Sequence, residues 1–142
     1  MIGIKRVDHV SFATWSVDEQ AKWFETVMGL TVAERFENPD EGYAGLVMDL
    51  PGNQLQFELI EPLGEDSFVE KFLKTRGPGM HHVTVEVHDA HAAAAALRTA
   101  GIEPFKGVHQ GGDWLQTYIH PGDSGGVLWQ LFQSSAEGAP QG

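Results

Sequence analysis

Four polar side chains stand within segments that are otherwise apolar, and together they could bind a metal ion. They are His9, Glu58, His82 and Gln130. A carboxylate is costly to bury unless it is paired, hydrogen-bonded or bound to a metal. Two imidazoles, one carboxylate and one amide oxygen form a mixed nitrogen and oxygen ligand set. Such a set suits a divalent ion such as Co, Ni, Mn, Zn or Fe(II), and a six-coordinate ion would keep two positions for water or substrate oxygens.

Each of these residues also has a simpler interpretation. A single histidine in a strand is more often a hydrogen-bonded core residue than a ligand, and Glu58 alone would more often face solvent or an ion pair. The remaining histidines have no counterpart elsewhere in the chain, and we expect them at the surface or beside a ligand: His81, His88, His91 and His109. Whether His120 lines the site is left open.

The four candidate ligands gain weight because they occupy matching positions in an internal repeat. His9 aligns with His82, and Glu58 aligns with Gln130. The offset is 73 residues at the first strands and 72 at the helix ends and last strands, so one deletion between helix and strand explains the difference. The aligned strand segments are 7–12 with 80–85, and 55–61 with 127–133. Four polar groups related by a pseudo-twofold repeat indicate a shared centre.

The elements that would position these residues follow from the same pattern. Ser16 and Glu19 form a capping box before a first helix, and Asp89 is a plausible N-cap for a second helix over Ala90–Ala100. Gly29 and Gly101 follow these helices and favour a left-handed C-cap. The first helix has an apolar stripe formed by Val17, Ala21, Phe24 and Met28. The remaining expected elements are strands at 31–36, 43–50, 104–106 and 114–120, and a short helix at 67–75.

The predicted fold class is therefore α+β, with two tandem βαβββ modules. We expect one domain over residues 1–133, followed by a disordered tail at 134–142. Module one covers 4–62, a linker helix lies in 63–79, and module two covers 80–133.

Composition narrows the functional classes. The 142 residues carry a net charge of −11, which argues against a nucleic-acid surface because phosphate binding needs a basic patch. Cysteine is absent, so no disulfide framework or thiolate chemistry is expected. No apolar run reaches the roughly 20 residues that would cross a membrane. A cytoplasmic protein with a small-molecule substrate is the expectation.

The chain resembles the vicinal-oxygen-chelate superfamily, which includes glyoxalase I and extradiol dioxygenases, and within it the methylmalonyl-CoA epimerase branch. The matching segments lie at 7–10, 58–67, 77–83 and 120–128. The resemblance implies a glyoxalase-like, barrel-like curved sheet and places His9, Glu58 and His82 on three metal-ligand positions. It also implies an acyl-CoA or aromatic substrate and leaves room for a homodimer.

Departures from the epimerase pattern concern the groups that move protons. Epimerases have a glutamate at the position of Gln130, where it acts as ligand and as acid or base. A second glutamate of the family belongs to the strand over 43–48, which has no carboxylate here. The family's lysine after the His-Pro dipeptide is also missing from Gly122–Ser124. The usual two-base route, in which one group removes a proton and another returns it, therefore lacks its residues.

Three functions remain open. The first is a metal-dependent isomerase or lyase that moves a proton beside a carbonyl or thioester, with Glu58 as the base and an enolate stabilised by the metal. The second is a non-haem Fe(II) dioxygenase, because two histidines and one carboxylate are the inventory of its facial triad; Trp114 and Phe132 would suit its aromatic substrate. The third is a binding or resistance protein that uses the fold without metal chemistry.

Overall fold

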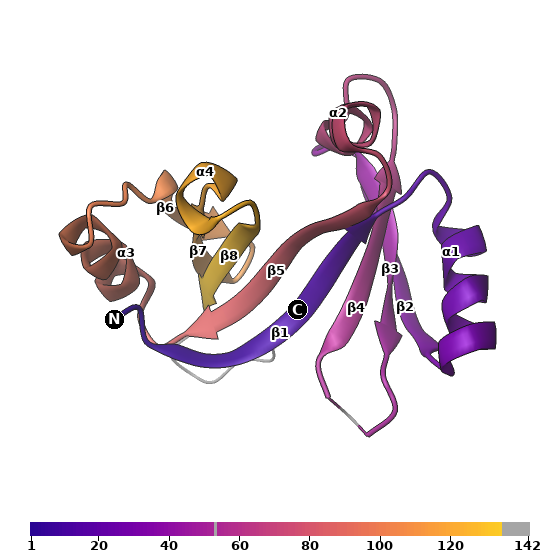
Figure 1. Cartoon of the computed structure of the whole chain (residues 1–142), viewed down its shortest axis with the longest axis horizontal. Coiled ribbons are helices and arrows are strands. Elements are labelled where there is room, and N and C mark those ends of the chain that lie inside the picture. The colour runs from indigo at the N-terminus through magenta and orange to yellow at the C-terminus, as the bar shows by residue number, and fades with distance from the viewer. Residues whose placement is uncertain (53, 135–142) are drawn as a thin grey trace. The chain divides into compact units, whose positions relative to one another are not determined.

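The computed structural model describes residues 1–52 and 54–134, and their contacts divide into two compact units. One unit spans His9–His81, and the other combines Met1–Asp8 with the chain from His82 onward. The predicted tail lies outside the described residues except for Ser134. The elements follow one another as β1 (Ile4–Ala13), α1 (Val17–Trp23), η1 (Phe24–Met28), β2 (Thr31–Asn38), β3 (Tyr43–Asp49), β4 (Gln56–Pro62), α2 (Phe68–Arg76), β5 (Gly79–Val87), α3 (Ala90–Thr99), β6 (Phe105–Gly111), β7 (Trp114–Ile119), α4 (Pro121–Ser124) and β8 (Leu128–Gln133) (Figure 1).

The repeat predicted from the sequence is present in the order of these elements. β1, α1 and β2–β4 form the first βαβββ run, and β5, α3 and β6–β8 form the second, with α2 between them. Within each run the first strand pairs parallel with the last, and the other neighbours are antiparallel. The strand order is β2-β3-β4-β1-β5-β8-β7-β6, a single mixed sheet of eight strands. Its end strands are β2 and β6, so among the described residues the sheet is not closed, although the sequence suggested a barrel-like form.

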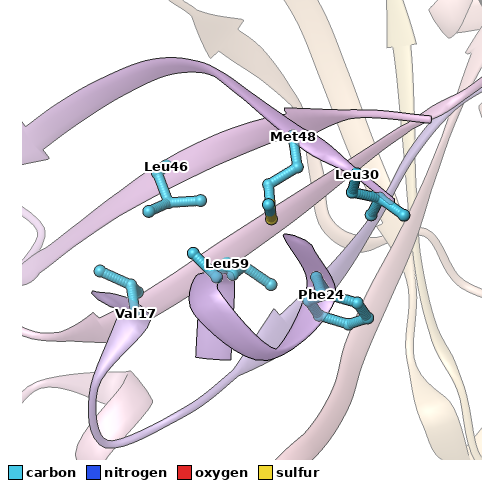
Figure 2. Close-up of a cluster of buried hydrophobic side chains, with 7 residues drawn as sticks. Val17, Phe24, Leu30, Leu46, Met48 and Leu59 are labelled. Carbon is cyan, nitrogen blue, oxygen red and sulfur yellow. The ribbon is translucent and has the colours of Figure 1, made fainter. Parts of the chain in front are cut away.

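The α1 helix covers one face of the first four-stranded half. Leu46, Met48 and Leu59 are fully buried beneath Val17 and Phe24 (Figure 2). Because side chains alternate along a strand, Glu58 points to the opposite face from Leu59. The sequence of β4 thus places apolar side chains under the helix and leaves the other face for chemistry.

The end of the first helix differs from its prediction. Residues Phe24–Met28 form a π-helical turn, which has more residues per turn than an α-helix. Val17, Ala21 and Phe24 are buried as expected, but the wider turn rotates Met28 away from the core and leaves it 46% exposed. The turn closes at Gly29, whose φ of 75° confirms the expected left-handed cap.

The α3 helix covers the equivalent face of the second half. Ala93 and Leu97 pack on Val85, Val87 and Leu131. Asp89 caps the helix as predicted, because its carboxylate accepts a hydrogen bond from the backbone N–H of Ala92 at 2.9 Å. Thr84 and Gln130, which alternate with the packed residues, therefore point to the other face.

Strand β6 is longer than the sequence indicated. The expected segment 104–106 overlaps only the first two residues of β6, because the strand runs from Phe105 to Gly111. Lys106 and Gly107 have φ angles of 66° and 62°, which shifts the register between Phe105 and His109. This break disturbs the apolar and polar alternation that a sequence reading depends on.

The short helix α2 confirms the prediction for the segment between the repeats. Ser67 caps it by accepting from the N–H of Val69 at 3.1 Å. Val69 and Leu73 pack against Ala13 and Ile60 on the same face of β4 as Glu58. The helix thereby covers one end of that face. No helix among the described residues is long and apolar enough to span a membrane.

Candidate metal centre

The first half of the candidate site is a hydrogen-bonded group on β1 and β4. The Ser11 hydroxyl donates to Oε1 of Glu58 at 2.8 Å, and the two residues are paired in the parallel register of these strands. Nε2 of His9 lies 3.7 Å from the same Oε1. The side chains of His9 and Glu58 are only 14% and 18% exposed, so imidazole and carboxylate meet in a largely desolvated place.

The second half has the same construction on β5 and β8. The Thr84 hydroxyl donates to Oε1 of Gln130 at 2.9 Å, and these residues are again paired in the parallel register. His82 lies two positions before Thr84 and therefore on the same face of β5. Both His82 and Gln130 are half-buried.

Three of the four predicted ligands form a group that could hold a metal ion. His9, Glu58 and His82 each offer one ligand atom, and these atoms all lie within 4.8 Å of one another. Two imidazole nitrogens and a carboxylate oxygen fit a divalent first-row ion, and the partial burial of all three favours coordination over hydration. The donor set therefore fits the expected metal.

On the same face of the sheet as Glu58, β3 carries Tyr43, which lies opposite Pro62 of β4. Burial, and then the negative charge of Glu58, raise the pKa of Tyr43, so its phenol stays protonated at neutral pH. The ring contacts Phe36 and Phe68 edge-on. Two positions along, Gly45 has no side chain, and a Cβ there would lie 2.7 Å from the Phe36 ring. An apolar surface thus stands where the resemblance would place the second glutamate.

In the second unit, Gln130 belongs to a longer polar cluster that sequence reasoning missed. Nε2 of Gln130 donates to Oε1 of Gln116 at 2.6 Å, and Nε1 of Trp114 donates to the same oxygen at 3.3 Å. The other end of Gln116 faces Nε2 of His109 at 3.1 Å. In the sequence, only the residue types of His109 and Trp114 pointed to this cluster. The register in which β6 and β7 pair, which brings its members together, was not evident from the sequence.

The remaining histidines take different positions. His88 and His91 are exposed, as expected. His81 packs against the rings of Phe68 and Phe72, and burial together with the charge of Arg76 lowers its pKa to about 4. His120 is exposed and caps α4 by accepting a hydrogen bond at Nδ1 from the N–H of Gly122 at 2.9 Å.

Residues 8–118 match the family model of the Glyoxalase/Bleomycin resistance protein/Dioxygenase superfamily. An ethylmalonyl-CoA/methylmalonyl-CoA epimerase from Cereibacter sphaeroides is 35% identical over 140 residues, which cover 94% of this chain and 99% of that protein. The human mitochondrial methylmalonyl-CoA epimerase is 32% identical over 135 residues, which cover 91% and 74% of the two chains.

A solved structure supports the same relationship. The methylmalonyl-CoA epimerase of Mycobacterium tuberculosis superimposes with a TM-score of 0.81 at 30% identity, covering 94% of this chain and 91% of that one. These matches confirm the resemblance that the sequence motifs indicated.

Proposed function

The chain belongs to the Glyoxalase/Bleomycin resistance protein/Dioxygenase superfamily, and from this premise we propose that it is a divalent-metal-dependent isomerase or lyase that moves a proton at a carbon next to a thioester carbonyl. The observation that carries the proposal is the group formed by His9, Glu58 and His82. The substrate class is a coenzyme A thioester, as the names of the related epimerases suggest. A cytoplasmic location and a homodimer remain predictions.

The proposed ligands are the three grouped residues together with the amide oxygen of Gln130. An ion held by them would supply a Lewis acid for the carbonyl oxygen of the substrate. A ligand role for Gln130 is supported by its position, which the repeat aligns with Glu58. Each of the two residues also accepts a hydrogen bond from a hydroxyl group on the neighbouring strand. Substitution at any of the four positions should therefore weaken metal binding.

Glu58 is the proposed base. Its carboxylate would take the proton from the α-carbon, and the electron pair of the broken C–H bond would move toward the carbonyl oxygen. The same carboxylic acid would then return a proton to the α-carbon on the face it left, and inversion would follow only when water protonates the enolate from the other face. The bond from Ser11 fixes the orientation of the carboxylate during both steps. Because Gln130 is an amide, it cannot act as a general acid or base at neutral pH.

A single base makes a prediction that separates this protein from a two-base epimerase. A two-base enzyme couples removal on one face to return on the other, whereas one base can return the proton only to the face it came from. We therefore expect solvent deuterium to enter the α-position of methylmalonyl-CoA or ethylmalonyl-CoA faster than the configuration inverts. Mass spectrometry measures the exchange, and chiral analysis of the recovered thioester measures the inversion.

Glu58→Gln tests the base, with Glu61→Gln as a matched control on the same strand. Loss of a general base typically lowers a rate by about 10²–10⁴-fold, so we expect exchange to fall by at least about 100-fold in Glu58→Gln. Glu61→Gln makes the same chemical change three residues away and should keep the wild-type rate. Equal rates for wild type and Glu58→Gln at saturating metal would contradict the role of Glu58.

A second candidate function rests on the composition of the same group. Two histidines and one carboxylate are also the ligands of non-haem Fe(II) oxygenases. In the second unit, the half-buried Trp114 packs against the buried Phe132 with ring centroids 6.2 Å apart, so Trp114 is the aromatic residue that could contact such a substrate. Iron retained after anaerobic purification, together with oxygen uptake in the presence of catechols, would favour this function over proton transfer.

A further inference from the structure

A continuous chain of side-chain hydrogen bonds runs across β6, β7 and β8 of the second unit. It begins at the carbonyl of Gly107, which lies 3.3 Å from Nδ1 of His109, and passes through Gln116 to Gln130. It ends where the Thr84 hydroxyl donates to the oxygen of Gln130. His109, Gln116 and Gln130 are half-buried, so water competes weakly for these bonds.

The direction of the chain is fixed at both sides of Gln116. A carbonyl only accepts, so Nδ1 of His109 donates to it, and a ring with a single proton then leaves Nε2 as an acceptor. The NH₂ group of Gln116 must therefore face His109. On the other side, the Trp114 indole only donates, so it requires the oxygen of Gln116. That oxygen in turn requires the NH₂ group of Gln130, not its oxygen.

We propose that Gln116 is a positioning residue that fixes the orientation of the Gln130 amide, with the nitrogen toward β7 and the oxygen toward Thr84 on β5. β5 is also the strand that carries His82. An amide binds a metal ion through its oxygen, so the orientation that Gln116 enforces is the one a ligand needs. The inference deepens the proposed function and rests on it for the ligand role of Gln130.

The same contacts explain why an amide stands at position 130. A carboxylate there would turn one of its oxygens toward the oxygen of Gln116, and two acceptors repel each other. Rotation of Gln116 would remove that conflict but would leave the Trp114 indole without its acceptor. Gln116 therefore selects glutamine over glutamate at its neighbour.

The backbone of β6 makes room for this arrangement at Gly111. A Cβ on Gly111 would lie 2.5 Å from Nε2 and 2.6 Å from Cδ of Gln116. Its nearest neighbours are thus the far end of a flexible side chain, which can move. Gly111→Ala should displace the Gln116 amide without removing any polar group, and it provides a second way to break the chain.

The first test uses metal-free, ¹⁵N-labelled protein. In Gln116→Leu, the Gln130 side-chain NH₂ protons lose their acceptor and should exchange with solvent at least about tenfold faster, because unbonded amides are unprotected. The Trp114 indole N–H resonance should shift in the same variant. Gln110→Leu is the matched control, since Gln110 is exposed on the same hairpin and, within the described part of the chain, donates to the Gly112 carbonyl alone. Unchanged Gln130 exchange in Gln116→Leu would overturn the orienting role.

The second test measures Co²⁺ affinity by competition with a chelator. Partners that orient metal ligands are typically worth about 10–100-fold in affinity, so Gln116→Leu should weaken Co²⁺ binding by that amount while Gln110→Leu changes it less than about twofold. Because Gln116 acts through Gln130, the double variant Gln116→Leu/Gln130→Ala should bind no more weakly than Gln130→Ala alone. Multiplying effects in the double variant would contradict the proposal.

The two tests separate failure of this inference from failure of the proposed function. If the wild type binds no Co²⁺, the metal site and the ligand role of Gln130 both fall, while the exchange measurement on metal-free protein still decides whether Gln116 orients the amide. If wild type binds Co²⁺ and Gln116→Leu binds it equally well, the proposed function stands and the positioning role is wrong. Should Gln116→Leu fail to fold, Gly111→Ala replaces it in both tests with the same expected direction.

Discussion

The two βαβββ modules build the same local contacts from different chemical groups. In the first, Ser11 donates to the carboxylate of Glu58, and in the second, Thr84 donates to the amide oxygen of Gln130. Each pair joins the first strand of its module to the last in the same parallel register. The contact needs only an acceptor oxygen, which either side chain provides.

The helix caps show the same exchange. The N–H of Val17 donates to Oε1 of Glu61 at 2.8 Å, and the N–H of Ala90 donates to Oε1 of Gln133 at 2.8 Å. The last strand of each module therefore caps the helix of that module. Twice, a carboxylate in the first module corresponds to an amide in the second. The scaffold preserves hydrogen bonding in both modules, whereas the proposed proton transfer would use the first module alone.

The strands next to these residues differ more. In the paired strands β2 and β3, Phe36 lies opposite Gly45, and in β6 and β7, His109 lies opposite Gln116. The first module thus places an aromatic ring beside β4, and the second places a polar pair beside Gln130. The repeat therefore determines the backbone and the positions of the acceptor oxygens. The chemical surroundings of each half depend on the strands β2 and β3 in the first module and β6 and β7 in the second.

The largest expected difference between the modules is catalytic. At saturating metal, Glu58→Gln should lower α-proton exchange by about 10²–10⁴-fold, because it removes the base. Gln130→Leu should lower it by only about tenfold, because it removes a ligand but no proton-transfer group. Deuterium incorporation at matched metal occupancy measures both. Equal losses would show that the two halves contribute alike and would contradict the division of roles.

The next difference concerns stability at the two glycines. A Cβ on Gly45 would collide with the carbonyl oxygen of Leu59, a backbone atom of the paired strands β3 and β4. Gly45→Ala should therefore cost about 1–3 kcal/mol or more of unfolding free energy. The atoms nearest to a Cβ on Gly111 belong to the Gln116 side chain, which can move, so Gly111→Ala should cost less than about 1 kcal/mol. Urea denaturation of metal-free protein tests this order, which the reverse ranking would contradict.

The repeat aligns Ala13 on β1 with Glu86 on β5, so only the second module carries an ionisable side chain at this position. We therefore expect the second module to lose stability in acid through Glu86. Although burial alone would raise it, hydrogen bonds from Ser134, Arg6 and Lys5 hold the pKa of Glu86 below its usual 4.5. The ionised Glu86 carboxylate therefore stabilises the folded protein above about pH 4.5, and this contribution is lost as the pH falls toward the lowered pKa. Glu86→Gln should cost roughly 1 kcal/mol at neutral pH and show a smaller further loss below pH 4.5. The free energy of unfolding is measured against pH for wild type and for Glu86→Gln, and parallel curves would exclude this contribution of Glu86.

The smallest expected difference between the modules is at the helix caps. Removal of a capping side chain typically costs about 0.5–2 kcal/mol, so Glu61→Ala and Gln133→Ala should both be mildly destabilising. Glu61→Ala should lose slightly more, because a negative charge at a helix N-terminus adds about 0.3–1 kcal/mol. Thermal unfolding at low and high salt separates the two terms, since salt should reduce only the excess at Glu61. A salt-independent difference would contradict the charge explanation.

The sequence predicted the parts of this fold that depend on local pattern and on the repeat. Alternation along β1 and β4 gave the face of His9 and Glu58, and the caps at Asp89 and Gly29 were evident from residue type. The repeat also predicted that His9 and Glu58 lie near each other, because polar residues at matching positions of two related modules indicate a shared centre. These are short-range or symmetry-based arguments, which a single sequence supports well.

The rest depended on pairing that no local pattern reveals. The cluster of His109 and Gln116 needs the register of β6 and β7, which the positive φ angles at Lys106 and Gly107 disturb. The exposed Met28 follows from a π-turn that residue propensity does not signal. The repeat aligns Ser11 with Thr84, so the two hydroxyl groups could be matched from the sequence. Their bonds to Glu58 and Gln130 depend on the pairing of the strands, which the sequence does not reveal.

Elemental analysis of protein purified without chelators is the most direct test of the central claim. Wild type should carry close to one divalent ion per chain, either as isolated or after incubation with Co, Ni, Mn, Zn or anaerobic Fe(II). Glu58→Ala should lose most of that metal, and Gln130→Ala should retain less than wild type, whereas the control Glu61→Ala should match wild type. A wild type that takes up none of these ions would contradict the metal-dependent account and leave a binding protein on the same fold.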